Sequence, residues 1–201
     1  MVLDGTVSDS VISSVRAQLV AQIGDENPRP YSVTFLGLES LEVLTFLPRQ
    51  DAFARFATLG CSRYPMSDPS EMIADATRGP RAELILITRV FDGIDTSFLQ
   101  NIAKLAASPS VEGVVLRPDL LLDIGEPLWK GAPFTAVLLG DSEIDDLVLP
   151  EPADPVKFLQ LVPITSTEAA WVRLRGAEAL RDAWKEAGID VRDPARSAVT
   201  L

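Results

Sequence analysis

The chain has 201 residues, of which 47% are apolar and 23% charged, a length and balance that favour one globular domain with a sizeable core and exclude extensive disorder. Its formal net charge of −11, from 29 acidic and 18 basic residues, disfavours nucleic acid as a partner, because phosphate backbones are bound mainly through Lys and Arg. The absence of histidine and the presence of one cysteine exclude His-dependent nucleophiles, internal disulfides and ordinary zinc sites.

The first predicted element is a helix near the N-terminus. Apolar residues recur at helical spacing over residues 11–23, Ser8 or Asp9 can cap the start, and Gly24 ends the helix. Prolines then break the chain. We expect residues 1–29 to be a helix and linker that form part of the same domain as the rest.

Three strands are predicted next, over residues 31–36, 41–47 and 53–59, and the tight turns between them favour antiparallel pairing. Residues 60–80 then form a long, proline-containing loop, for which we expect one helical turn at residues 70–75. Long loops in compact domains are often functional. One hypothesis is therefore that this loop docks the protein into a larger complex.

A strongly apolar strand follows over residues 82–91, with Glu83 as its only charge before Arg89, and its composition predicts a central strand buried on both faces. Asp95 then caps a second helix, and Ser108–Pro109 is predicted to end it. Five shorter segments beyond it are predicted as strands. They cover residues 114–116, 120–122, 134–139, 147–149 and 156–164.

The last third carries the clearest helix signals. Thr165 and Glu168 have the spacing of a capping box, and Gly176 separates this helix from a second one over residues 177–187. Gly188 is predicted to end that helix in a Schellman motif. From residue 193 onward we expect a frayed tail.

This order of elements predicts an α+β fold with a mixed, mainly antiparallel sheet packed with helices. The main domain is expected over residues 30–190, with residues 191–201 as a C-terminal tail. The N-terminus lacks a basic and apolar leader, and no apolar run is long enough to span a membrane. We therefore expect a cytoplasmic protein without a membrane partner.

The densest group of carboxylates is the run Asp141, Glu143, Asp145 and Asp146. A calcium loop is excluded, because its sixth position would need glycine and its twelfth glutamate. Three interpretations stay open: a solvated acidic turn, a loose magnesium site, and a contact surface for a basic protein partner, toward which the net charge steers.

The alternative to a binding protein is a metal-dependent hydrolase that uses carboxylates such as Asp119, Asp123 and Asp141. No phosphate-binding glycine loop and no nucleophile elbow occur in the sequence. We therefore predict neither a cofactor nor a catalytic residue. Cys61 could be activated by Arg63, but a small buried side chain is the more common environment of a cysteine.

Several segments resemble the suppressor of fused-like family, and the similarity extends over about residues 30–187. The pattern of a strand, a Pro-Ile pair and a capped helix is typical of the bacterial members. The segments are residues 31–35, 41–46, 58–62, 65–66, 81–86, 158–168 and 176–180.

This resemblance implies an α+β domain that works by binding proteins rather than by catalysis. For bacterial members it also implies a role as an immunity protein that neutralises a toxin. With the acidic net charge, we expect the partner to be a basic toxin, contacted by the four carboxylates at residues 141–146.

Overall fold

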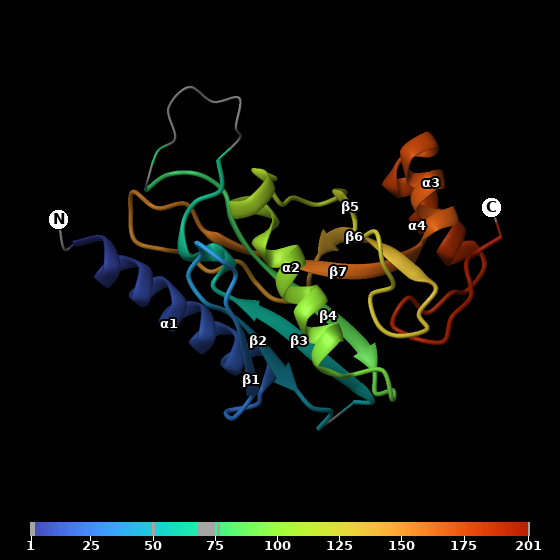
Figure 1. Ribbon diagram of the computed structural model, residues 1–201, viewed down its shortest axis with the longest axis horizontal. Helices are drawn as coiled ribbons and strands as arrows, with labels where there is room; N and C mark the ends of the chain where they lie inside the picture. The colour runs from blue at the N-terminus through green and yellow to red at the C-terminus, as the bar shows by residue number, and fades with distance from the viewer. Residues whose placement is uncertain (1–2, 50, 68–74, 76, 201) are drawn as a thin grey trace.

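The computed structural model describes residues 3–49, 51–67, 75 and 77–200, and its centre is one seven-stranded sheet (Figure 1). The strand order is β1-β2-β3-β4-β7-β6-β5, and every neighbouring pair is antiparallel except β4 and β7. This mixed, mainly antiparallel sheet with helices confirms the predicted α+β class. The strands are β1 (Arg29–Val33), β2 (Leu41–Phe46), β3 (Phe53–Leu59), β4 (Arg81–Arg89), β5 (Leu121–Asp123), β6 (Phe134–Asp141) and β7 (Val156–Thr165).

Helices cover both faces of this sheet. Odd-numbered residues of β6 and β7, such as Val137 and Leu161, pack in one cluster with α2. From Ala136 onward in β6 and throughout the buried part of β7, even-numbered residues face the other side, where Phe158 packs with α1, and Leu138 packs with α3 and α4. Along the molecule, α1 lies toward one end and α3–α4 toward the other (Figure 1). The helices are α1 (Leu3–Ile23), α2 (Thr96–Glu112), α3 (Ser166–Arg175) and α4 (Ala177–Glu186), with a short 3-10 helix, η1 (Cys61–Arg63).

The predicted strands are largely present. β4 is the middle strand of the sheet and almost wholly buried, as its apolar composition predicts. The strand expected at residues 114–116 is wrong, because Leu116 instead donates its backbone N–H to the Met66 sulfur. Residues 147–149 contribute only a single bridge, from Leu147 to Val156. The helical turn expected at residues 70–75 lies outside the described residues.

Two helix boundaries differ from the prediction. α1 begins at Leu3, so neither Ser8 nor Asp9 caps it. α2 continues through Pro109 to Glu112. Proline removes one N–H, which would leave the Leu105 carbonyl without its usual donor, but the Ser108 hydroxyl donates to that carbonyl at 2.8 Å. The helix can therefore continue past the proline.

The capping signals that the sequence shows for the two C-terminal helices are present in the structure. The capping box at Thr165 and Glu168 is present, with both reciprocal bonds formed. Gly188 adopts a left-handed conformation, and the backbone N–H of Ile189 donates to the Trp184 carbonyl, as in a Schellman motif.

Residues 194–200 are not frayed, contrary to the prediction. Arg196 and Val199 are buried, and Arg196 forms an ion pair with the fully buried Glu168 at 2.7 Å. A cation next to a buried carboxylate compensates its charge, so this segment belongs to the folded core. Within the described part of the chain, no helix combines the length and the apolar character needed to cross a membrane.

Candidate functional site

The four predicted partner-binding carboxylates lie where β6 leads into the connection to β7. Asp141 is the last residue of β6, and Glu143, Asp145 and Asp146 follow it, all with exposed side chains. We call residues 141–146 the acidic loop.

The acidic loop is held against α1 by glutamines. Gln22 accepts the Asp145 backbone N–H at 2.9 Å and donates to the Asp145 carboxylate at 3.4 Å, while Gln18 donates to the Asp145 carbonyl at 3.1 Å. Ile144 packs into the cluster beneath α1. The loop backbone is therefore fixed, whereas its carboxylates face solvent.

Two hollows flank the acidic loop. One of about 240 Å³ is bordered by Glu143, but its two arginines already have partners: Arg49 pairs with Asp25 at 2.7 Å, and Arg55 pairs with Asp51 at 2.6 Å. The hydrogen bond from Arg55 is the largest influence that lowers the pKa of Asp51. This hollow is largely neutralised by its own side chains.

The second hollow, of about 400 Å³, lies between the β6–β7 surface and α4 and is bordered by Asp141. Asp119 also borders it and pairs with Arg181 of α4 at 2.5 Å. Asp141 has no such partner among the described residues. Asp141 pairs with Leu159 in the sheet, and Leu159 packs on the α2 side, so the Asp141 side chain points away from the face that carries this hollow.

The carboxylates of the hydrolase alternative do not come together as one site. Asp123 pairs with Arg173 of α3 at 2.9 Å, and Asp119 pairs with a different arginine, Arg181. Among the described residues, no group of three or more His, Cys, Asp or Glu is arranged to hold a metal ion. The arrangement gives this alternative no support.

Cys61 lies in η1, half-buried against the core. Burial raises the pKa of its thiol well above the usual value, and the Glu83 carboxylate raises it further. A thiol held protonated is a poor nucleophile, so the environment of Cys61 fits a packing role.

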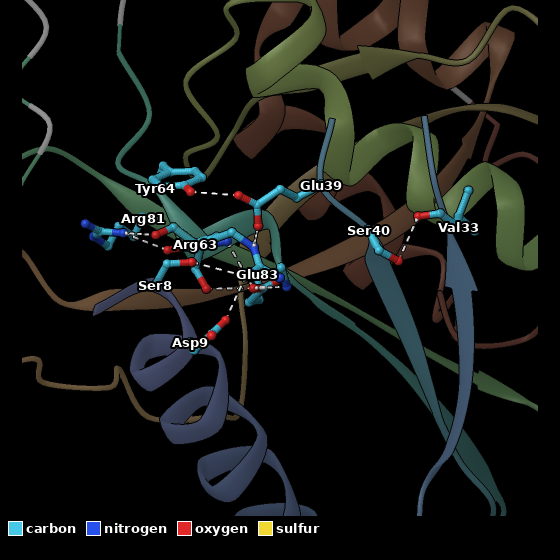
Figure 2. Close-up of polar contacts among 11 residues, drawn as sticks. Ser8, Asp9, Val33, Glu39, Ser40, Arg63, Tyr64, Arg81 and Glu83 are labelled. Atoms are coloured by element: carbon cyan, nitrogen blue, oxygen red, sulfur yellow. Dashed lines mark hydrogen bonds and ion pairs between the residues drawn. The ribbon is translucent and has the colours of Figure 1, made fainter. Parts of the chain in front are cut away.

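A buried polar network near Cys61 escaped the sequence analysis (Figure 2). Glu83 of β4 is fully buried and accepts hydrogen bonds from the Thr58 hydroxyl at 2.6 Å, the Gly60 N–H at 2.9 Å, and both the N–H and hydroxyl of Ser62, at 3.0 and 2.6 Å. Its position as the only acidic residue in an apolar strand was the available signal. The strand pattern could not show which loop would supply the donors.

Arg63 connects this network to the surface and to α1 (Figure 2). Its guanidinium pairs with Glu39 at 2.9 Å and with Asp9 at 3.4 Å, and donates to the Ser8 hydroxyl at 3.1 Å. The Tyr64 hydroxyl donates to the same Glu39. These contacts fix the start of the 60–80 loop, and their chemistry is structural.

A family model described as Suppressor of fused protein (SUFU) matches residues 37–197. The solved structure of a SUFU homologue from Neisseria gonorrhoeae FA 1090 is similar, with a TM-score of 0.70 and 19% identity, and the match covers 94% of this chain and 96% of that one. Comparison with curated protein sequences found no match.

Two further solved structures share the fold. A chain of the Sufu–Fu complex matches with a TM-score of 0.64 and 14% identity, covering 94% of this chain and 91% of that one. Drosophila Suppressor of Fused matches with a TM-score of 0.58 and 16% identity, covering 94% of this chain but 51% of that one, so the chain spans about half of that relative. Since the family model covers well over half of its residues, the protein belongs to the suppressor of fused family.

Proposed function

We propose that this protein is a non-catalytic binding protein that recognises a basic protein partner through the acidic loop. The observation that carries the proposal is that the Asp145 backbone is fixed by Gln18 and Gln22 while the surrounding carboxylates stay exposed. A loop that is ordered before binding loses less conformational entropy in the complex. Family membership supports the proposal, since a chain of similar fold is part of the Sufu–Fu complex.

We further propose that the partner is a basic toxin and that binding neutralises it in the cytoplasm. A toxin that acts on phosphate-containing substrates needs a cationic cleft. Carboxylates fixed on a rigid loop can occupy such a cleft in place of phosphates. The net charge of −11 would also accelerate the encounter with a cationic surface.

The test compares charge-reversed loops in affinity capture from the source organism's lysate, at low and high salt. The variant Asp145→Lys plus Asp146→Lys is expected to weaken capture of a basic protein about tenfold or more and to flatten its salt dependence. The matched control, Asp182→Lys plus Glu186→Lys on the exposed surface of α4, makes the same change in net charge away from the acidic loop. Equal capture by both variants would refute the role of the loop.

The toxin hypothesis needs a second readout. The captured partner is expressed in a test host, alone and together with this protein. We expect growth arrest by the partner, rescue by the wild-type chain, and loss of rescue with the reversed loop. A partner that does not affect growth would contradict neutralisation and leave the binding function intact.

A further inference from the structure

Side chains from three separate parts of the chain meet at one end of the sheet face that carries α1. Phe53 and Arg55 of β3 share this face with Ala57, which packs beneath α1, because side chains two residues apart in a strand point the same way. Arg89 is the register partner of Phe53 and lies on the same face. Arg192, from the segment after α4, lies beside them, because its carbonyl accepts the Arg89 N–H at 3.0 Å. Three arginines are thus brought together.

The Phe53 ring is the platform on which two of these arginines meet. The guanidinium of Arg192 lies 4.1 Å from the ring centroid, and that of Arg89 lies 5.5 Å from it. Both guanidiniums pair with one carboxylate, that of Asp190: the Arg192 Nε lies 2.9 Å from one oxygen, and the Arg89 Nη2 lies 3.1 Å from the other. We call Phe53, Arg89, Asp190 and Arg192 the arginine cluster.

The arginine cluster has one positive charge in excess, because two cations share one anion. A guanidinium has five N–H donors, and among the described residues only one donor from each of Arg89 and Arg192 reaches a carboxylate. Their side chains are 52% and 41% exposed, so the remaining donors are accessible from solvent. In a chain whose net charge is −11, this surface has the opposite sign.

The nearest carboxylates are already engaged. Asp51 accepts two hydrogen bonds from the Arg55 guanidinium, at 2.6 and 3.2 Å. The Asp193 carboxylate accepts the Ala195 N–H at 2.9 Å, within its own turn. The excess charge of the arginine cluster is therefore available to an anion from outside the chain.

The size of this charge favours a carboxylate as the ligand. A carboxylate carries one negative charge and can accept two parallel N–H donors from a guanidinium edge. A phosphate monoester carries about −1.5 to −2 near neutral pH, which is more than the cluster neutralises. Stacking on an aromatic ring also holds a guanidinium in place for such planar recognition.

The arginine cluster lies next to the surface that includes the acidic loop. Arg55 and Asp51 border the hollow of about 240 Å³ that is also bordered by Glu143 of the acidic loop. The pKa of Asp51 is lowered mainly by the hydrogen bond from Arg55 and also by the charge of Arg192, which therefore lies near this hollow. One stretch of surface is thus negative at the acidic loop and positive at the arginine cluster.

We propose that the arginine cluster binds an Asp or Glu carboxylate of the same basic protein that the acidic loop recognises. This inference rests on the proposed function, because it assigns a second contact to that partner. Two contacts of opposite sign fix the orientation of the partner, since a reversed partner would place like charges opposite each other.

The test uses the peptide acetyl-Gly-Glu-Gly-amide as probe, with glutamine in place of glutamate as the neutral control. Binding at low salt is followed by NMR of the ¹⁵N-labelled full chain. We expect saturable shifts at the backbone amides of Phe53, Arg89 and Arg192, and affinity about fivefold weaker for the glutamine peptide, as the loss of one partly exposed ion pair implies.

A matched pair of arginine variants tests the location. Arg89→Gln removes one guanidinium of the cluster and is expected to weaken binding of the glutamate peptide about fivefold. Arg175→Gln is the control, because Arg175 is exposed and also lies over an aromatic ring, that of Trp171, at 5.3 Å. It makes the same change in net charge and should leave binding unchanged.

Asp190→Asn separates ligand binding from a purely structural role of the cluster. Asparagine keeps an oxygen for the Arg192 N–H, which donates to Asp190 at 3.1 Å, but it removes the internal anion. The excess charge of the cluster rises, and we expect the glutamate peptide to bind about threefold more tightly. Loosening of the structure would not produce such a gain.

Equal affinity of wild type and Arg89→Gln for the glutamate peptide would overturn the proposal, as would the absence of a gain in Asp190→Asn. Binding of a phosphoserine peptide about tenfold more tightly than the glutamate peptide would instead assign the cluster to phosphate and also overturn it.

Partner capture distinguishes this inference from the proposed function. If the Asp145→Lys plus Asp146→Lys reversal weakens capture but Arg89→Gln captures as well as Arg175→Gln, the acidic loop stands and the arginine cluster is not part of the interface. If the glutamate peptide binds the cluster but capture ignores the reversal, the carboxylate subsite stands and the acidic loop is not the recognition element.

Discussion

Glu83 is fully buried, and its carboxylate accepts four hydrogen bonds from Thr58, Gly60 and Ser62. A buried carboxylate costs free energy unless its acceptor sites are filled, and here backbone and hydroxyl donors fill them. As a result, the Glu83 side chain holds the segment that follows β3 against β4. The short helix η1 begins in this segment.

Removing this carboxylate leaves several donors without an acceptor. We therefore expect Glu83→Ala to lower the free energy of unfolding by about 3 kcal/mol or more, measured by urea denaturation. Glu83→Gln keeps an oxygen for Gly60 and Ser62 and alters mainly the bond with Thr58, so its effect should be clearly smaller. Equal losses in the two variants would contradict the role of the hydrogen bonds.

Glu168 is the second buried carboxylate, and its titration affects stability. Burial raises the pKa of Glu168, but hydrogen bonds from Arg196, the Thr165 N–H and the Trp184 indole outweigh it, and the pKa lies below its usual 4.5. The unfolded chain therefore takes up the proton first as the pH falls. The stabilisation is complete above pH 4.5 and is lost as the pH falls through the pKa of the folded state.

The free energies of unfolding of wild type and Glu168→Gln, measured in urea at several pH values between about 6 and 3, test this titration. At neutral pH the variant should be less stable by about 3–5 kcal/mol, because Arg196 loses the carboxylate that compensates its buried charge. The difference should shrink as the pH falls below 4.5. A difference that is constant with pH would contradict the assignment.

At the scale of elements, α2 depends on a polar side chain near each end, the Asp95 cap at its start and Ser108 beside Pro109 near its end. The Asp95 carboxylate accepts the Phe98 N–H at 3.0 Å, and this bond is the largest influence that lowers the pKa of Asp95. At the other end, Ser108 supplies the donor that Pro109 lacks. A helix can thus continue past a proline when a neighbouring side chain satisfies the free carbonyl.

The cap makes a testable contribution to stability. We expect Asp95→Ala to reduce the free energy of unfolding by about 1 kcal/mol, because the Phe98 N–H loses its acceptor, and Asp95→Asn to cost much less. Asp92→Ala, at an exposed position in the preceding turn, is the control and should have little effect. Thermal and urea unfolding measure all three; a loss in the control as large as that of Asp95→Ala would refute capping.

On the scale of the whole molecule, the C-terminal segment links the sheet to the C-terminal helices. Arg196 joins Glu168 of α3 to the Pro163 carbonyl of β7, and Val199 is buried in the cluster formed by α3 and α4. The Arg192 carbonyl also accepts the Arg89 N–H at the end of β4. Distant parts of the sheet are thus linked by residues near the chain end.

Truncation tests this link. A chain ending at Pro194 leaves Glu168 buried without its cation, and we expect it to lose about 3–5 kcal/mol of stability or to fail to fold. A chain ending at Thr200 keeps both Arg196 and Val199 and should match the wild type. Urea unfolding and near-UV circular dichroism distinguish the outcomes, and a stable chain ending at Pro194 would contradict the proposed link.

The sequence predicted elements whose signals are local. The capping box at Thr165, the cap at Asp95 and the buried composition of β4 all depend on residues within a few positions, and the structure confirms them. Two of the wrong predictions, the strand at residues 114–116 and the frayed tail, concern contacts between distant segments. Residues 114–116 have strand composition, but without a strand partner they pack as an irregular segment.

For the candidate site, the sequence by itself showed that the chain lacks histidine and is acidic, and it singled out the acidic loop as a candidate binding element. Only the tertiary structure decided that Gln18 and Gln22 hold that loop, that Asp119 is paired with Arg181, and that Arg89 and Arg192 share the carboxylate of Asp190. The reason is physical: periodicity and capping act between near neighbours, whereas ion pairs and hollows form where sheet pairing brings distant segments together.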